Sequence, residues 1–187
     1  MKRTYGYILT ALTAIVMTLE MGMAAFASFD YNKSVDEIAA SPLTAYNTVY
    51  LGMPRADFGA NFALLPDWKF YGSSISYQER AERSTVKNSI PVTEGIQIFT
   101  ANPSASGKVL AFDSYFKTAD KKTAKDIYTR LMATIYSNME NFPQRQSSSS
   151  VTWVQNDVTI AVSYTEQKDE DGQYVVLIRR YNNHVLG

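Results

Sequence analysis

The segment 119–141 constrains the fold most, because its apolar residues recur at the spacing of an α-helix. The recurring residues, separated by steps of three or four, are Ala124, Tyr128, Leu131, Ile135, Met139 and Phe142. Such a stripe is typical of a helix that buries one side and leaves the others in water. Thr118 or Asp120 is expected to cap its beginning, and Pro143 to end it. The rest of the chain must therefore supply an apolar surface for this helix to cover.

Runs of strand-forming residues on both sides of that helix predict such a surface. The expected strands cover residues 68–71, 73–85, 95–101 and 108–117 before the helix, and 151–154, 158–165 and 173–181 after it. Turn-forming sequences such as 102–107, 155–157 and 168–172 separate them. Strands joined by tight turns pair antiparallel. We therefore predict an α+β fold with one antiparallel sheet of about six or seven strands, in the order helix, four strands, helix, three strands.

Two further helices are expected before the first strand. Residues 54–65 begin with Pro54, which suits a first helical position, carry an apolar side and end at Pro66. This helix and the segment 119–141 should cover one face of the sheet. A short helix is expected within residues 28–47, where Ser34 and Glu37 form a capping-box pattern and Ser41 precedes a proline. We expect residues 28–47 to be a polar N-terminal segment, and residues 48–187 to form a single domain.

The first 27 residues are typical of a secretory signal peptide. Lys2 and Arg3 precede an apolar run, and Ala25-Phe26-Ala27 fits the small-x-small pattern for cleavage before Ser28. The alternative is an uncleaved membrane anchor, although the apolar run is short for a span. We expect an exported protein that is periplasmic, associated with the cell envelope or secreted, and that contacts a membrane only if this segment is retained.

The composition excludes several classes of chemistry. The chain has 18 basic and 18 acidic side chains, so its charge gives no general attraction to nucleic acid. It has no cysteine, which excludes thiolate nucleophiles, cysteine-ligated zinc and iron–sulfur clusters. Its one histidine, His184, leaves almost nothing for a histidine metal site or a catalytic triad. We predict no catalytic, cofactor-binding or metal-binding residue.

Two sets of residues keep functional alternatives open. Glu79 and Glu82 alternate with Arg80 and Arg83, which indicates a solvated strand edge more than the carboxylate pair of a hydrolase. The aromatic residues that fall in or near expected strands are Trp153, Tyr164, Tyr174 and Tyr181. Their burial in the core is the main interpretation. On an uncovered sheet face they would instead form a binding platform for a peptide, glycan or protein.

One short stretch resembles a known family. Residues 49–58 (VYLGMPRADF), followed by Trp68, resemble the opening of the SmpA/OmlA (BamE-like) and β-lactamase-inhibitor-like envelope domains. This sequence has Leu65-Pro66-Asp67 where that family usually has Gly-x-Pro, and it lacks the lipoprotein cysteine. The resemblance implies a helix packed on an antiparallel sheet and a role in protein–protein contact, with no catalytic residue.

The sequence therefore predicts an exported, non-enzymatic protein that binds another envelope or extracellular protein. The alternative is a small-ligand or glycan-binding domain that uses strand aromatics, and a carboxylate hydrolase is the least favoured.

Overall fold

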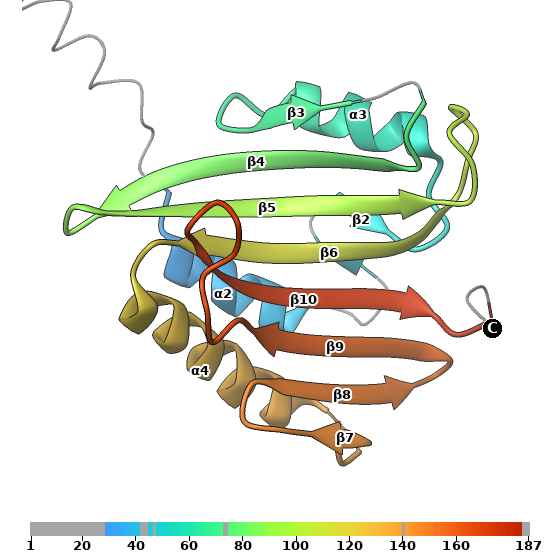
Figure 1. The fold of residues 1–187 in the computed structure, drawn as a ribbon. Coiled ribbons are helices and arrows are strands. Elements are labelled where there is room, and N and C mark those ends of the chain that lie inside the picture. The colour runs from blue at the N-terminus through green and yellow to red at the C-terminus, as the bar shows by residue number, and fades with distance from the viewer. Residues whose placement is uncertain (1–28, 42–44, 47, 73–74, 140, 185–187) are drawn as a thin grey trace, which may run out of the picture.

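The computed structural model describes residues 29–41, 45–46, 48–72, 75–139 and 141–184. An eight-stranded antiparallel sheet forms one layer, and helices with a small hairpin form a second layer behind it (Figure 1). This arrangement confirms the predicted α+β class. The predicted signal peptide and its cleavage residues Ala25, Ala27 and Ser28 lie outside the described residues.

The described residues form three helices and ten strands. The helices are α2 (Tyr31–Ala40), α3 (Arg55–Ala63) and α4 (Lys121–Asn138). The large sheet contains β3 (Lys69–Tyr71), β4 (Gln78–Lys87), β5 (Ile90–Thr100), β6 (Val109–Thr118), β7 (Arg145–Gln146), β8 (Ser150–Gln155), β9 (Val158–Tyr164) and β10 (Tyr174–Asn182). A separate hairpin pairs β1 (Ala45–Tyr46) with β2 (Val49–Tyr50).

Two four-stranded meanders meet at the centre of the sheet. Its strand order is β3-β4-β5-β6-β10-β9-β8-β7, so each meander contributes its last strand to the junction. There β6 and β10 pair antiparallel, with Thr118 opposite Tyr174 and Ala111 opposite Tyr181. The predicted helix-and-strand order is correct for the main strands but omits β7 and the β1–β2 hairpin. Strands of two residues are too short to show the alternation that reveals a strand in a sequence.

Strand β4 begins later than predicted, at Gln78 instead of residue 73, but it ends at Lys87 instead of residue 85, and β5 begins at Ile90 instead of residue 95. They meet at a tight turn whose two central residues, Asn88 and Ser89, have φ angles of 52° and 64°. Positive φ at both positions is typical of a type I′ hairpin turn, in which asparagine is common and serine is not. Because no glycine is present, no turn was predicted here from the sequence.

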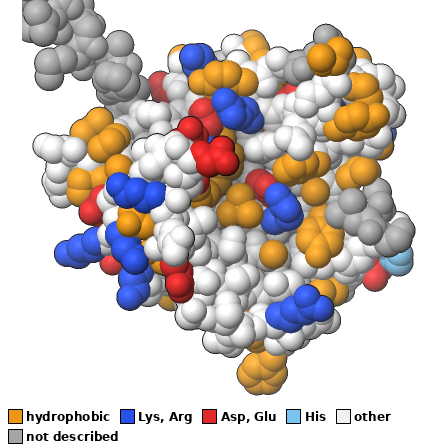
Figure 2. Space-filling model, viewed as in Figure 1, with side chains coloured by type: hydrophobic (Ala, Val, Ile, Leu, Met, Phe, Trp, Pro, Cys, Tyr) orange, Lys and Arg blue, Asp and Glu red, His pale blue; other side chains and the backbone are white. Residues whose placement is uncertain are grey.

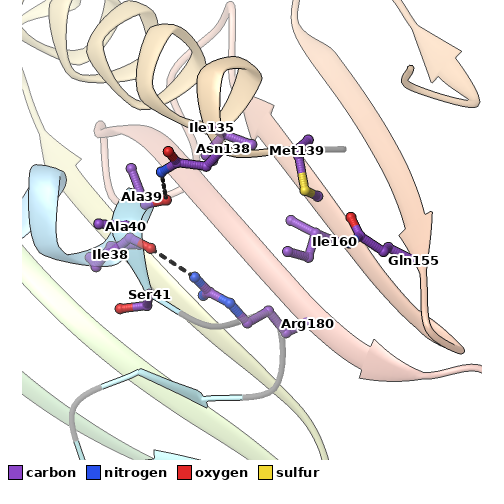
Figure 3. A pocket seen from close by; sticks show the side chains of 10 residues that line it. All are labelled: Ile38, Ala39, Ala40, Ser41, Ile135, Asn138, Met139, Gln155, Ile160 and Arg180. Atoms are coloured by element: carbon purple, nitrogen blue, oxygen red, sulfur yellow. Dashed lines mark hydrogen bonds between the residues drawn. The ribbon is translucent and has the colours of Figure 1, made fainter. Parts of the chain in front are cut away.

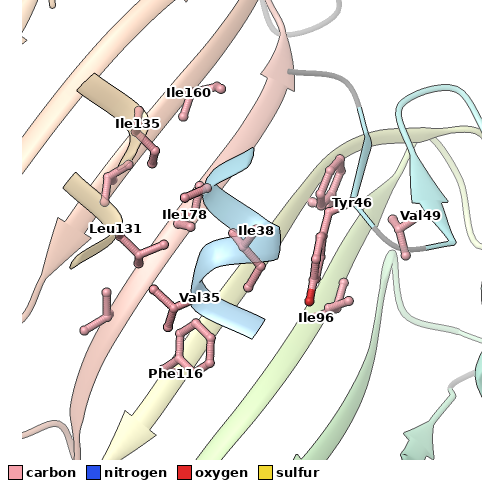
Figure 4. Packing of buried hydrophobic residues seen from close by; sticks show 14 of the residues in the cluster. Val35, Ile38, Tyr46, Val49, Ile96, Phe116, Leu131, Ile135, Ile160 and Ile178 are labelled. Carbon is pink, nitrogen blue, oxygen red and sulfur yellow. The ribbon is translucent and has the colours of Figure 1, made fainter. Parts of the chain in front are cut away.

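Helix α4 packs its apolar stripe against the second meander and β6. Asp120 is its N-cap and accepts a hydrogen bond from the Thr123 amide at 2.8 Å. Leu131 and Ile135 point toward the sheet, near Ile178 (Figure 4). Phe142 does not belong to the stripe, because α4 ends at Asn138 and the phenyl side chain is 93% exposed.

Helix α2 lies within the same core rather than in a separate polar segment. It packs against α4, and its Val35 and Ile38 are fully buried. Its N-cap is Asp30, not Ser34 as the capping-box pattern suggested. The Ser34 hydroxyl is buried and accepts a hydrogen bond from Arg83 instead.

Helix α3 covers the outer part of the first meander. Pro54 precedes the helix as its N-cap instead of occupying the first helical position. Phe58 and Phe62 are fully buried and meet Phe70 and Trp68 edge-on. Three helices therefore share one face of the sheet, where the sequence predicted two. Within the described part of the chain, no helix has both the length and the apolar character needed to cross a membrane.

Candidate binding surface on the uncovered sheet face

The sheet face opposite the helices carries a layer of aromatic and charged side chains. Figure 1 is seen from this side, with the strands in front of α2, and none of the described helices lies over it. Figure 2 shows the same face, on which apolar side chains lie among charged ones. The strand register places Phe99, Asp113, Tyr115, Arg179 and Tyr181 on this side. We refer to it below as the uncovered face.

An ion pair occupies the middle of the uncovered face. Arg179 donates from Nε and Nη2 to the two carboxylate oxygens of Asp113, both at 2.7 Å. Asp113 is only 3% exposed, because Arg179 covers it. The hydrogen bonds to Asp113 raise the pKa of Arg179, so the guanidinium stays charged. It also lies 5.2 Å from the centre of the Phe99 ring, which fixes a cation and an aromatic ring side by side.

Tyr115 lies across Gly95 on the neighbouring strand. A Cβ atom at Gly95 would come within 2.1 Å of the tyrosine ring, so only glycine leaves room for it. The Tyr115 hydroxyl donates to Glu82 at 2.6 Å, and burial together with this carboxylate raises the pKa of Tyr115. The phenol therefore remains a donor at physiological pH, and the ring is held flat against the sheet.

The outer strands continue the same layer. The Tyr71 ring lies between Lys69 and Arg80, whose charged groups are 5.0 and 4.7 Å from its centre. Gln97 donates to Gln78 across β4 and β5 at 2.7 Å. These cross-strand contacts hold the exposed side chains in place before any partner arrives. A layer ordered in this way loses little side-chain entropy on binding.

Basic groups outnumber acidic ones on the uncovered face. Within the described strands the register places five basic side chains on it, Lys69, Arg80, Lys117, Arg145 and Arg179. The acidic side chains there are Glu82 and Asp113, and both already accept hydrogen bonds from this face. Among the described strand residues, this face therefore carries more basic than acidic side chains, although the chain as a whole has equal numbers of the two.

The four aromatic residues singled out from the sequence do not form one surface. Trp153 is fully buried and Tyr164 is 9% exposed, and both face the helices, with Trp153 against Tyr136 and Tyr164 against Tyr128. Tyr174 also faces the helix side, half-buried beside the core. Only Tyr181 projects from the uncovered face, where it is half-buried. Successive residues of a strand point to opposite faces of the sheet, so these four aromatic side chains are divided between the two faces. Which face each one takes depends on the strand register, which the sequence does not reveal.

The two glutamates considered for a hydrolase lie on opposite faces of the sheet. Glu79 faces the helices and forms an ion pair with Arg55 at 2.9 Å, while Glu82 binds Tyr115 on the uncovered face. Their segment is also not a solvated edge, because β3 pairs with part of β4 and Arg83 binds the fully buried Glu94. Glu79 and Glu82 therefore do not converge on one substrate.

The described residues also contain no cluster of potential metal ligands. Among these residues no group of three histidine, cysteine, aspartate or glutamate side chains could hold a metal ion. His184 is exposed, with Nε2 3.1 Å from the carboxylate of Asp157.

The comparisons with known proteins leave the family open. No protein-family model matches the chain, and no curated protein or solved structure is significantly similar to it. The resemblance of residues 49–58 to the SmpA/OmlA and β-lactamase-inhibitor-like domains stays a prediction.

Proposed function

We propose that this chain is an exported, non-enzymatic binding module that docks an acidic surface of another envelope or extracellular protein. The uncovered face is the observation that carries the proposal. It presents tyrosine, phenylalanine and arginine side chains, and tyrosine and arginine are enriched among the residues that dominate binding energy at interfaces. Its excess of basic groups favours an acidic partner, because complementary charge speeds association and fixes orientation.

Three further considerations support this function. The signal-like N-terminus favours export, the resemblance of residues 49–58 implies protein–protein contact, and Glu79 and Glu82 are separated by the sheet. A platform that binds glycans through Trp153 and Tyr164 is disfavoured, because the helices cover both residues.

Charge reversal on the uncovered face tests the proposal. The variant Arg80→Glu/Lys117→Glu should lose at least tenfold in affinity for the partner, since both side chains lie on this face. Lys122→Glu/Lys125→Glu, an equal change on the exposed side of α4, is the matched control and should bind as the parent does. Partners are captured from an extracytoplasmic extract, identified by mass spectrometry and titrated at about 0.05 and 0.5 M salt.

If both variants captured the same proteins equally well, the uncovered face would not be the binding surface. A partner found only in the cytoplasm would contradict the proposal that the protein is exported. Melting curves of both variants check that the fold is intact.

A further inference from the structure

A cavity lies on the other side of the sheet, where the C-terminal ends of α2 and α4 approach β9 and β10 (Figure 3). Its volume is about 230 Å³. Side chains that line it include Ile38, Ile135, Asn138, Met139, Ile160 and Arg180. Ser41 and Gln155 line it as well, so its walls are about as polar as they are apolar, with one cationic group.

Arg180 is buried with most of its hydrogen-bonding capacity unused. The residue is 1% exposed, and its Nη2 donates to the carbonyl oxygen of Ile38 at 3.0 Å. Within the described part of the chain, Nε and Nη1 have no acceptor. The guanidinium also lies 5.4 Å from the centre of the Phe112 ring. A role as a cap for the C-terminal end of α2 accounts for Nη2 alone and leaves the other two nitrogens without a function.

Arg180 also differs from the other partly or fully buried arginines of the sheet and α3. Those arginines each bind a carboxylate, in the pairs Arg55–Glu79, Arg83–Glu94 and Arg179–Asp113. Across the described residues no acidic side chain forms an ion pair with Arg180; the titratable group that faces it is the phenol of Tyr46. Burial lowers the pKa of Arg180 to about 10, which still leaves the group charged at neutral pH. A buried cation without an anion is costly, and removing it from water is compensated only when an anion reaches it.

We propose that this cavity binds a small carboxylate with a short apolar tail. One carboxylate oxygen would accept a hydrogen bond from either Nε or Nη1 of Arg180, the two donors that the described residues leave unused and that point to different sides of the guanidinium. The tail would lie against Ile135, Met139 and Ile160. An apolar cavity of about 150 Å³ holds benzene, so this larger one suits an acid of about six to eight carbons. This site is separate from the uncovered face and does not depend on the proposed docking function.

Hexanoate is the probe that tests the site. Hexanoate added to the purified protein should raise its melting temperature saturably and give one-site binding by calorimetry. 1-Hexanol, which has the same tail without the charge, and acetate, which has the charge without the tail, should each bind at least tenfold more weakly. Saturable binding of hexanol or acetate as tight as that of hexanoate would overturn the proposal, as would no saturable binding of hexanoate.

Variants separate the charge from the cavity. Arg180→Met should weaken hexanoate binding at least tenfold and leave the ligand-free protein at least as thermostable, because an apolar side chain replaces an unpaired buried cation. Arg145→Met removes an exposed arginine from β7 and should bind hexanoate as the parent does. Ala39→Leu keeps Arg180 but fills part of the cavity, and should also weaken binding. Unchanged binding in both Arg180→Met and Ala39→Leu would contradict the proposal.

Discussion

The two meanders of the sheet bury their helix-facing side by different means. The first meander, β3 to β6, places charged residues under its cover, and the second, β7 to β10, is covered largely by apolar contacts. One sheet can therefore combine an ionic interior and an apolar interior, provided that each charge in the ionic part has a partner.

The ionic interior centres on Glu94. This carboxylate is fully buried and accepts hydrogen bonds from Arg83 at 2.8 Å and from the Tyr46 hydroxyl at 3.0 Å. Arg83 also binds the Ser34 hydroxyl of α2 at 2.9 Å. Burial raises the pKa of Tyr46, so its hydroxyl remains a donor. This network ties α2, β1, β4 and β5 together through hydrogen bonds and an ion pair.

The apolar interior centres on Trp153. This side chain is fully buried beneath α4, with its ring 5.1 Å from that of Tyr136 and its strand neighbours Val151 and Val162 buried beside it. Arg180 at the edge of this region is the exception, and the cavity beside it is where we propose a ligand.

Truncation of Trp153 should have the largest effect on the second meander. Trp153→Ala removes a fully buried indole beneath α4 and should lower the free energy of unfolding by about 3–5 kcal/mol, as large core truncations do. Urea denaturation followed by circular dichroism measures the change. Phe142→Ala is the matched control, because that ring is 93% exposed and its loss should be nearly neutral. Equal effects of the two substitutions would show that α4 does not pack on β8 as described.

Breaking the network of Glu94 should have the next largest effect. Glu94→Leu leaves Arg83 without its carboxylate and should cost about 3 kcal/mol. Arg83→Met added to Glu94→Leu removes both charges and should restore most of that loss, since an apolar pair can replace a buried ion pair. A double-mutant cycle from urea melts gives the coupling. Additive losses would mean that the two charges do not stabilise each other.

The cap of α4 should have the smallest effect and should depend on pH. Asp120→Ala should lower the melting temperature by about 2–4 °C, the usual consequence of losing a helix N-cap in a chain of this size. Hydrogen bonds from the Thr123 hydroxyl and amide hold the pKa of Asp120 below its usual value of 3.8. The cap's contribution is therefore fully present above that value and is lost as the pH falls through the lower pKa of the folded state.

Asp126→Ala, at an exposed position within the same helix, is the control and should melt as the parent does. A difference between the parent and Asp120→Ala that persists in strong acid would assign the effect to the alanine and not to the lost carboxylate.

Sequence patterns predicted the apolar half of the fold better than the ionic half. The helical stripe from Ala124 to Met139 and the strands after it stand out because apolar and polar residues alternate there with a clear period. In the first meander, Arg83 and Glu94 occupy helix-facing positions, so the polar pattern suggested solvent where the structure has a core. Pairing between β4 and β5 satisfies both charges, and that pairing is visible only in the folded protein.

The candidate surface could be predicted only in part, for a related reason. The aromatic residues on strands were visible in the sequence, but assigning them to faces required the pairing of β6 with β10, which are distant in the chain. Tyr115 shows the difficulty: it lies on the uncovered face yet is 4% exposed, because Gly95 lets it lie flat. The cavity beside Arg180 left no sequence signal, since Arg179-Arg180 alone does not reveal which guanidinium has a carboxylate partner.

The central position of β10 sets the order in which the molecule can fold. Its neighbours are β6 and β9, so the two meanders cannot join until the chain up to Asn182 is available. Contacts between segments so far apart form slowly, because a long loop must close first. A chain being synthesised could therefore not join its two meanders into one sheet until β10 had emerged.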